Sequence, residues 1–162
     1  MDSEIRNLLE DCLQNADSND LVVLRQLLQG LQKKQIIKQG SYIGGILQMA
    51  RKLDENSCEL TIPINPITMN NLGIVHGGIT ATVIDSAMGA LAGSLVPIGY
   101  ATVTTQLNIH YIAPGLGDYL HCKAIVEHKG TKTMVLSATV TTSDGKKIAK
   151  STGSFFIIKR QK

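Results

Sequence analysis

The chain has 162 residues, of which 43% are hydrophobic and 18% are charged, and its formal net charge at pH 7 is +3. This length fits one ordinary domain with a proper hydrophobic core, and the composition excludes an intrinsically disordered chain. So small an excess of basic residues also argues against a nucleic-acid-binding protein.

Two short helices are expected at the N-terminus, over residues 3 to 14 and 19 to 36. Leucines and isoleucines recur in both segments at the spacing of an amphipathic helix. The run from Ser18 to Asp20 offers capping side chains for the second helix.

The charge of this segment argues against DNA binding. Up to Gly30 it carries six acidic residues against Arg6 and Arg25, whereas a DNA-binding helix-turn-helix needs a basic surface. We therefore expect residues 1–38 to be a helical extension that covers part of a sheet or a dimer edge, and residues 39–162 to form the main domain.

Two strands are predicted before the central part of the chain. Residues 46 to 53 favour a first strand, and Asp54 to Asn56 favour a turn. From Cys58 to Ile64 apolar and polar residues alternate, as in a half-buried strand, which Pro63 helps to close.

An almost uninterrupted apolar or small-residue segment, from Ile79 to Val96, predicts a central helix that Pro97 and Gly99 end. Asp85 is its only ionisable residue, which argues against a membrane span. An all-round apolar helix is normally buried, and a lone buried carboxylate is costly unless it is paired or hydrogen-bonded. Asp85 is therefore the first candidate for a general base or nucleophile, and a structural carboxylate is the alternative.

The pair Gly77-Gly78 precedes this helix and allows a sharp turn and the close approach of another molecule. Free N–H groups at a helix N-terminus can hold a developing oxyanion, although a plain helix-start glycine is the simpler interpretation. Asp85 lies roughly 12 Å along the axis from Gly77 at the helical rise per residue, so one chain cannot bring both to one reacting carbon. Two antiparallel helices of a dimer would place Asp85 of each chain beside Gly77 of the other.

Four strands are predicted after the helix, over residues 101–112, 118–128, 132–143 and 146–158. Apolar and polar residues alternate in each, and hairpin signals separate the last three. A long apolar helix between two early and four later strands predicts an α+β hotdog fold, in which an antiparallel β-sheet wraps around the helix.

The motif from Asn70 to Gly78, Asn-x-x-Gly-x-x-His-Gly-Gly, is followed by Asp85 nine residues after His76. This pattern resembles the acyl-CoA thioesterases of the hotdog fold, in particular the PaaI-like branch of phenylacetate degradation and the branch of human thioesterase superfamily member 2. The resemblance runs from about residue 40 to the C-terminus. It implies hydrolysis of an aromatic or medium-chain acyl-CoA to free acid and CoA by a homodimer, expected to pair into a homotetramer.

The same resemblance implies a set of site residues. Gly77 would polarise the carbonyl, Asp85 of the neighbouring subunit would act as general base or nucleophile, and Thr104 would help position water. Asn70 would fix substrate or water, and His76 would shape the loop. As alternatives without a functional role, an asparagine pair in a loop more often serves only to form a turn, and threonine is a common residue in any strand.

Further candidates are substrate-binding residues. The turn with Lys129, Gly130 and Lys132 resembles the hairpin that contacts the CoA nucleotide in relatives, whereas a basic turn by itself is usually solvated surface. Gly78 would allow close approach of the substrate.

Other chemistry finds no support in the sequence. Cys12, Cys58 and Cys122 are odd in number and form no Cys-x-x-Cys pair, so neither a disulfide framework nor a zinc site is indicated. No P-loop, dinucleotide fingerprint or serine nucleophile elbow occurs, so no metal or cofactor is expected. Reduced cysteines and the absence of a secretory pattern favour the cytoplasm.

Two alternatives remain open at this stage. A non-catalytic hotdog domain could bind or sense acyl-CoA, although such a domain gains nothing from Asp85 in an apolar helix. A hotdog hydratase would place Asp and His about five residues apart in its catalytic motif, which we do not find.

Overall fold

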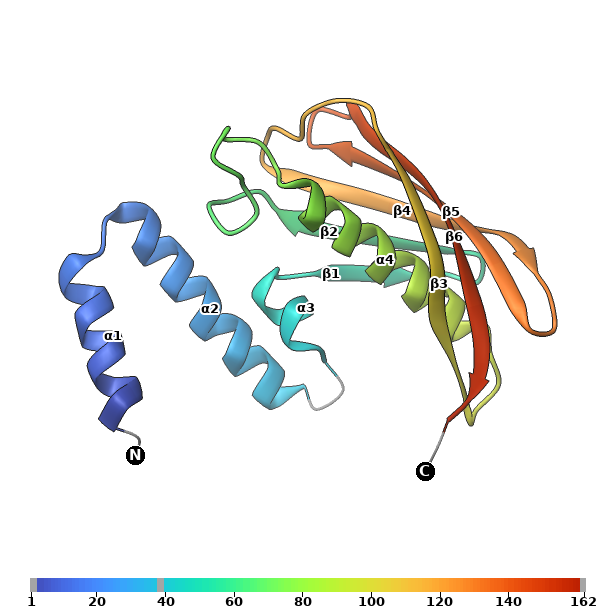
Figure 1. Cartoon of the computed structure of the whole chain (residues 1–162), viewed down its shortest axis with the longest axis horizontal. Coiled ribbons are helices and arrows are strands. Elements are labelled where there is room, and N and C mark those ends of the chain that lie inside the picture. Colours follow the sequence, from blue (N-terminus) through green and yellow to red (C-terminus); the bar gives the residue numbers. More distant parts are fainter. Residues whose placement is uncertain (1–2, 38–39, 161–162) are drawn as a thin grey trace. The chain divides into compact units, whose positions relative to one another are not determined.

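Figure 1 shows the computed structural model, which describes residues 3–37 and 40–160. The chain divides into two compact units, Met1–Gln48 and Met49–Lys162. The junction expected at residues 38 and 39 lies outside the described residues.

The first unit contains the helices α1 (Ser3–Asn15), α2 (Ser18–Ile36) and α3 (Tyr42–Ile46), which confirms the two predicted N-terminal helices. Helix α2 begins with a capping box. The Asp17 carboxylate accepts from the N–H groups of Asn19 at 2.7 Å and Asp20 at 2.9 Å, and Asp20 accepts in return from the Asp17 N–H at 3.1 Å. This reciprocal pair satisfies N–H groups that the helix itself leaves open.

Helix α3 corrects the strand predicted over residues 46 to 53, because the strand begins only at Ala50. The Ser41 hydroxyl caps α3 by accepting from the Gly44 N–H at 3.0 Å. Gly45 lies directly on Gly30 of α2, where an added Cβ would come within 2.5 Å of the Gly30 carbonyl oxygen. Short apolar runs do not distinguish helix from strand, and this backbone contact stabilises the helical form.

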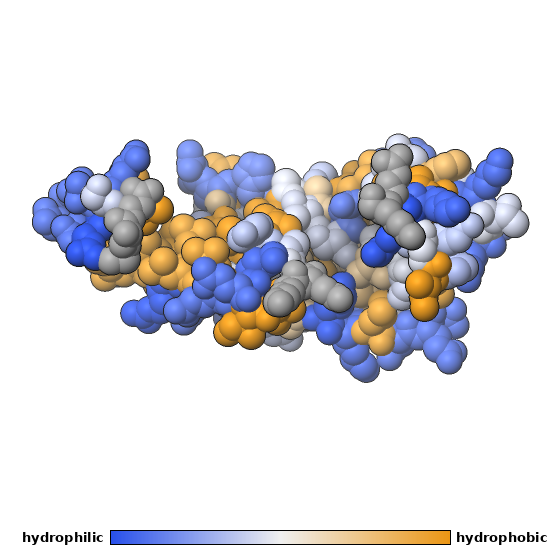
Figure 2. Space-filling view, turned by 90° about the horizontal axis from the view of Figure 1, so that it is seen from below, coloured by the Kyte–Doolittle hydropathy of each residue, from blue (hydrophilic) through white to orange (hydrophobic). Residues whose placement is uncertain are grey.

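Apolar side chains remain exposed on the first unit (Figure 2). No residue of α1 is buried among those that the structure describes. The exposed apolar residues of the two longer helices are Ile5, Leu8, Leu13, Leu21, Val22, Leu27, Leu28, Leu31 and Ile36.

The second unit is a six-stranded antiparallel sheet in the order β1-β2-β4-β5-β6-β3, with one long helix. Its elements are β1 (Ala50–Leu53), β2 (Ser57–Pro63), α4 (Gly77–Ser94), β3 (Tyr100–Tyr111), β4 (Tyr119–Lys129), β5 (Thr133–Thr142) and β6 (Lys147–Lys159). Helix α4 contacts every strand of the sheet, as Figure 1 shows. This arrangement confirms the predicted hotdog fold.

The core lies between α4 and the sheet. Val83, Ile84 and Met88 of α4 are fully buried, as are strand side chains such as Leu120 and Phe155. The opposite side of α4 is only half-buried in one chain, so the expectation of a helix buried on all sides is wrong for the single chain.

None of the helices in the described parts of the chain combines the length and the apolar character that a membrane span requires.

Candidate active site

Asp85 and Thr104 meet between α4 and β3. The Thr104 hydroxyl donates to the Asp85 carboxylate, with 2.8 Å between Oγ1 and Oδ1, and Asp85 is half-buried. The second carboxylate oxygen, Oδ2, accepts no hydrogen bond from any residue in the ranges described. The structure thus brings together two residues that the resemblance had placed in one site.

A β-bulge accompanies this contact. The register of β3 with β6 shifts between Thr104 and Gln106, and the hydroxyl of the intervening Thr105 donates to the Ser154 carbonyl at 3.0 Å. Bulges commonly re-aim side chains next to functional sites. Here the bulge gives two neighbouring threonine hydroxyls different partners.

The first prediction tests this pair. Thr104→Val keeps the side-chain shape but removes the hydroxyl that holds Asp85, so turnover should fall by about 10- to 100-fold, the rate equivalent of one hydrogen bond to a charged group. Thr105→Val is the matched control, because its hydroxyl bonds a backbone carbonyl instead. Steady-state kinetics of both variants measure the difference, and equal rates for the two would contradict a role for Thr104.

His76 caps α4 and determines which glycine N–H remains open. Its Nδ1 accepts from the Gly78 N–H at 2.9 Å, and its carbonyl accepts from the N–H groups of Ile79 at 2.9 Å and Thr80 at 3.2 Å. The Gly77 N–H has no partner among the residues that the structure describes. Of the two glycines, only Gly77 therefore presents a free donor at the helix N-terminus.

Asn70 builds the loop before α4. Its N–H donates to the Ile74 carbonyl at 2.9 Å, its carbonyl accepts from the Gly73 N–H at 3.0 Å, and its Oδ1 accepts from the Leu72 N–H at 2.9 Å. Gly73 has φ +70°, a left-handed conformation that favours glycine. Both Asn70 oxygens thus accept hydrogen bonds within the turn. The Asn70 Nδ2 makes no hydrogen bond within the described residues and is available to a ligand.

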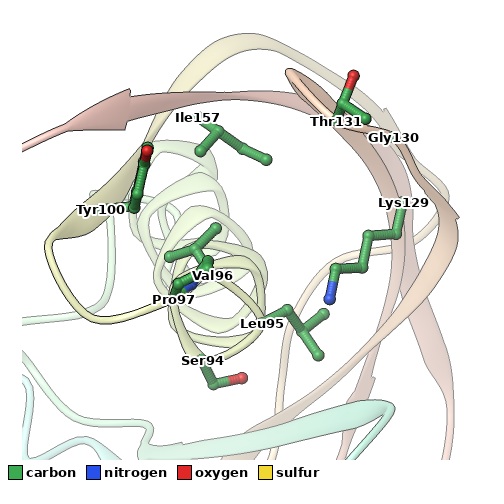
Figure 3. Close-up of a pocket in the computed structure, with 9 residues that line it drawn as sticks. All are labelled: Ser94, Leu95, Val96, Pro97, Tyr100, Lys129, Gly130, Thr131 and Ile157. Carbon is green, nitrogen blue, oxygen red and sulfur yellow. The ribbon is translucent and has the colours of Figure 1, made fainter.

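A pocket of about 600 Å³ lies at the opposite end of α4 (Figure 3). Its lining is Ser94, Leu95, Val96, Pro97, Tyr100, Lys129, Gly130, Thr131 and Ile157. The Lys129 side chain extends from the hairpin toward Leu95. Lys129 and Gly130 thus line a pocket, whereas Lys132 does not, and the Lys132 carbonyl accepts from the Ile157 N–H at 2.8 Å.

The predicted catalytic residues do not all meet within one chain. Asp85 and Thr104 are in contact, whereas Gly77 begins the helix that carries Asp85 in its interior. Eight residues of helix separate the two by roughly 12 Å. One chain thus contains both halves of the expected site, but not the complete site.

Tyr111 is a residue at this site that the sequence did not indicate. At the end of β3, its hydroxyl donates to the Gly77 carbonyl at 2.9 Å. No local pattern singles out this tyrosine, because the contact joins residues that are far apart in the chain.

The three cysteines are free, with Cys12 exposed and the other two buried. Burial raises the pKa of Cys122 to about 12 and also raises the pKa of Cys58. Protonated thiols in the core are poor nucleophiles, so Cys58 and Cys122 are not candidates for a nucleophile. In the described ranges, no group of three or more His, Cys, Asp or Glu side chains could hold a metal ion.

Comparison with known proteins identifies several similar chains. The family model described as "Thioesterase superfamily" matches residues 72–149. A curated protein of Halobacterium salinarum is 35% identical over 44% of this chain and 49% of its own length, and one of Saccharolobus solfataricus is 29% identical over 66% and 76%. Both carry the name "Putative esterase". The chain thus spans about half the length of the first of these relatives.

Solved structures match over more of the chain. A Bacillus halodurans protein crystallised with CoA is 37% identical, with a TM-score of 0.87 over 94% of this chain and 99% of that chain. A thioesterase family protein of Silicibacter pomeroyi is 25% identical, with a TM-score of 0.71 over 83% and 99%. The PaaI protein of the phenylacetic acid degradation operon of E. coli shares the fold, at 23% identity and a TM-score of 0.69 over 82% and 96%.

Proposed function

We propose, from the premise that the chain belongs to the thioesterase superfamily, that it hydrolyses acyl-CoA thioesters to a free acid and CoA. The observation that carries this proposal is the hydrogen bond of 2.8 Å from Thr104 to Asp85. It holds a half-buried carboxylate in one orientation and leaves its second oxygen without a partner among the described residues. An oriented carboxylate of this kind suits a general base or a nucleophile.

The proposed reaction begins with the thioester carbonyl oxygen on the Gly77 N–H. The partial positive charge at the N-terminus of α4 stabilises the negative charge that develops on that oxygen. Asp85 then either takes a proton from the attacking water or attacks the carbonyl carbon itself, in which case water hydrolyses the resulting anhydride. In both routes the carbon–sulfur bond breaks, CoA leaves as the thiol after protonation, and the acid is released.

We further propose that each site is shared by two chains, with Asp85 from one and Gly77 from the other. Two features support a dimer. Strand β3 is an edge strand, bonded to β6 alone, and edge strands of this length need covering. One side of α4, which includes Asp85 and Gly89, is half-buried in the single chain. A second copy would cover both, and pairing of dimers into a tetramer is part of the proposal.

The CoA moiety would bind in the pocket at the C-terminal end of α4. The Bacillus halodurans relative crystallised with CoA supports binding of this ligand, and the Lys129 ammonium suits a phosphate group. We propose that Lys129 and Gly130 contact the nucleotide, with Lys132 near the same turn. The N–H of Gly78 is already bonded to His76, so Gly78 would only allow the substrate to approach the backbone closely.

The direct test is a panel of acyl-CoAs, with phenylacetyl and medium-chain thioesters among them, monitored by release of free thiol. We expect hydrolysis of part of the panel, unchanged by EDTA, since no metal or cofactor is expected. If no member of the panel released thiol but CoA esters bound tightly, the non-catalytic alternative would be favoured. A cytoplasmic location remains part of the same proposal.

A further inference from the structure

The N-terminus of α4 begins with two consecutive glycines, Gly77 and Gly78, and the preceding residue is the cap, His76. Glycine lacks the Cβ that restricts φ and ψ, so the two residues do not by themselves favour one conformation. An oxyanion donor is effective only if its N–H already points at the position where negative charge develops. Something must therefore restrict the torsions at Gly77.

Two peptide groups meet at the Gly77 α-carbon. The first carries the Gly77 N–H, and its carbonyl, that of His76, accepts from Ile79 at 2.9 Å and Thr80 at 3.2 Å. The second joins Gly77 to Gly78, and its N–H donates to His76 Nδ1 at 2.9 Å. All these bonds lie within α4 and its own cap.

The carbonyl of the second peptide belongs to the first residue of α4 and accepts the helical bond, and it has a further partner from elsewhere in the fold. The Tyr111 hydroxyl donates to the Gly77 carbonyl oxygen at 2.9 Å. The second peptide group is thereby held at both ends, by His76 at its N–H and, beyond the helical bond, by Tyr111 at its carbonyl. Rotation about the Gly77 Cα–C bond would break both hydrogen bonds.

The tyrosine ring also lies against Gly77. A Cβ placed on Gly77 would be 3.5 Å from the ring atoms Cε1 and Cζ and from the hydroxyl oxygen. Tyr111 is nevertheless 57% exposed, so it is no core residue. The end of β3 that carries it is anchored to β6, where Tyr111 pairs with Ala149, and the next N–H, of Ile112, donates to the Ile148 carbonyl at 2.7 Å.

We propose that Tyr111 is a positioning residue for the oxyanion donor: its hydroxyl holds the Gly77–Gly78 peptide and so limits rotation about the backbone bonds of Gly77, which keeps the neighbouring Gly77 N–H in one direction. This proposal rests on the proposed thioester hydrolysis. Tyr111 bonds the peptide group next to the one that carries the donor N–H, and in this proposal it makes no contact with the substrate, so it acts on the chemical step more than on binding.

Tyr111→Phe tests the proposal, because it retains the exposed ring and removes only the hydroxyl. We expect kcat to fall by about tenfold, the equivalent of one hydrogen bond, while KM changes by less than about twofold. Tyr119→Phe is the matched control, since Tyr119 is a strand tyrosine, 41% exposed, whose hydroxyl has no partner within the described ranges. An unchanged kcat with a lowered melting temperature would overturn the proposal, because Tyr111 would then be structural.

A second readout does not depend on activity. NMR order parameters of the Gly77 and Gly78 amides report how tightly these peptides are held. They should fall in Tyr111→Phe and remain at the wild-type value in Tyr119→Phe, and equal values in all three proteins would overturn the proposal. A wild-type protein that hydrolyses no acyl-CoA would instead refute the proposed function, while the order parameters would still show whether Tyr111 holds the turn.

Discussion

Asp85→Asn is expected to lower turnover by at least about a hundredfold, because general-base catalysis typically contributes 10²–10⁴-fold and a nucleophile can contribute more. The substitution keeps the size of the side chain and an oxygen that can accept from Thr104, whose hydroxyl lies 2.8 Å from Asp85 Oδ1. It removes only the charge and the basic oxygen. Binding of CoA should weaken far less, since the proposed nucleotide contacts lie at the other end of α4.

Stability separates the catalytic role of Asp85 from a structural one. Removal of a partly buried charge at a functional site often leaves the melting temperature unchanged or raises it. Asp54→Asn, at an exposed position, is the control for the effect of replacing a carboxylate by an amide away from the site. A variant Asp85→Asn that hydrolyses acyl-CoA at the wild-type rate, or that unfolds before assay, would show that Asp85 is a structural carboxylate.

Gly77→Pro should lower turnover to a comparable extent, because proline has no N–H and thus removes the proposed oxyanion donor. Loss of one such donor costs about 10²–10³-fold in kcat. The backbone suits the change, since His76 has φ −62° and ψ 133°, the region that a residue before proline prefers, and proline is favoured at the first helical position. Gly77→Ala is the control, because it keeps the N–H and its Cβ would meet Tyr111 at an ordinary 3.5 Å.

The same two variants test whether the site is shared. When Asp85→Asn and Gly77→Pro chains are mixed and allowed to exchange subunits, each mixed dimer should contain one intact site and one site with both defects. Random mixing makes half of the dimers mixed, so activity should recover to about a quarter of wild type. A mixture no more active than the separate variants would show that Asp85 and Gly77 do not come from different chains.

Much of the fold could be predicted because it depends on neighbouring residues. Period-two alternation and hairpin turns located β2 to β6, and the apolar run located α4. The single carboxylate in that run singled out Asp85 before any contact was known. The prediction failed at α3, where a short apolar segment is compatible with helix or strand, and the packing of Gly45 on Gly30 favours the helix.

The contacts of the site depend on distant parts of the chain. Thr104 reaches Asp85 across a bulge that shifts the register of β3, and alternation along a strand does not indicate where such an extra residue falls. His76 takes the N–H of Gly78 and leaves that of Gly77 open, while Tyr111 approaches Gly77 from the far end of β3. Periodicity predicts which residues share a face of one element, whereas these contacts depend on how α4 is placed against the sheet, which the packing of the whole domain determines.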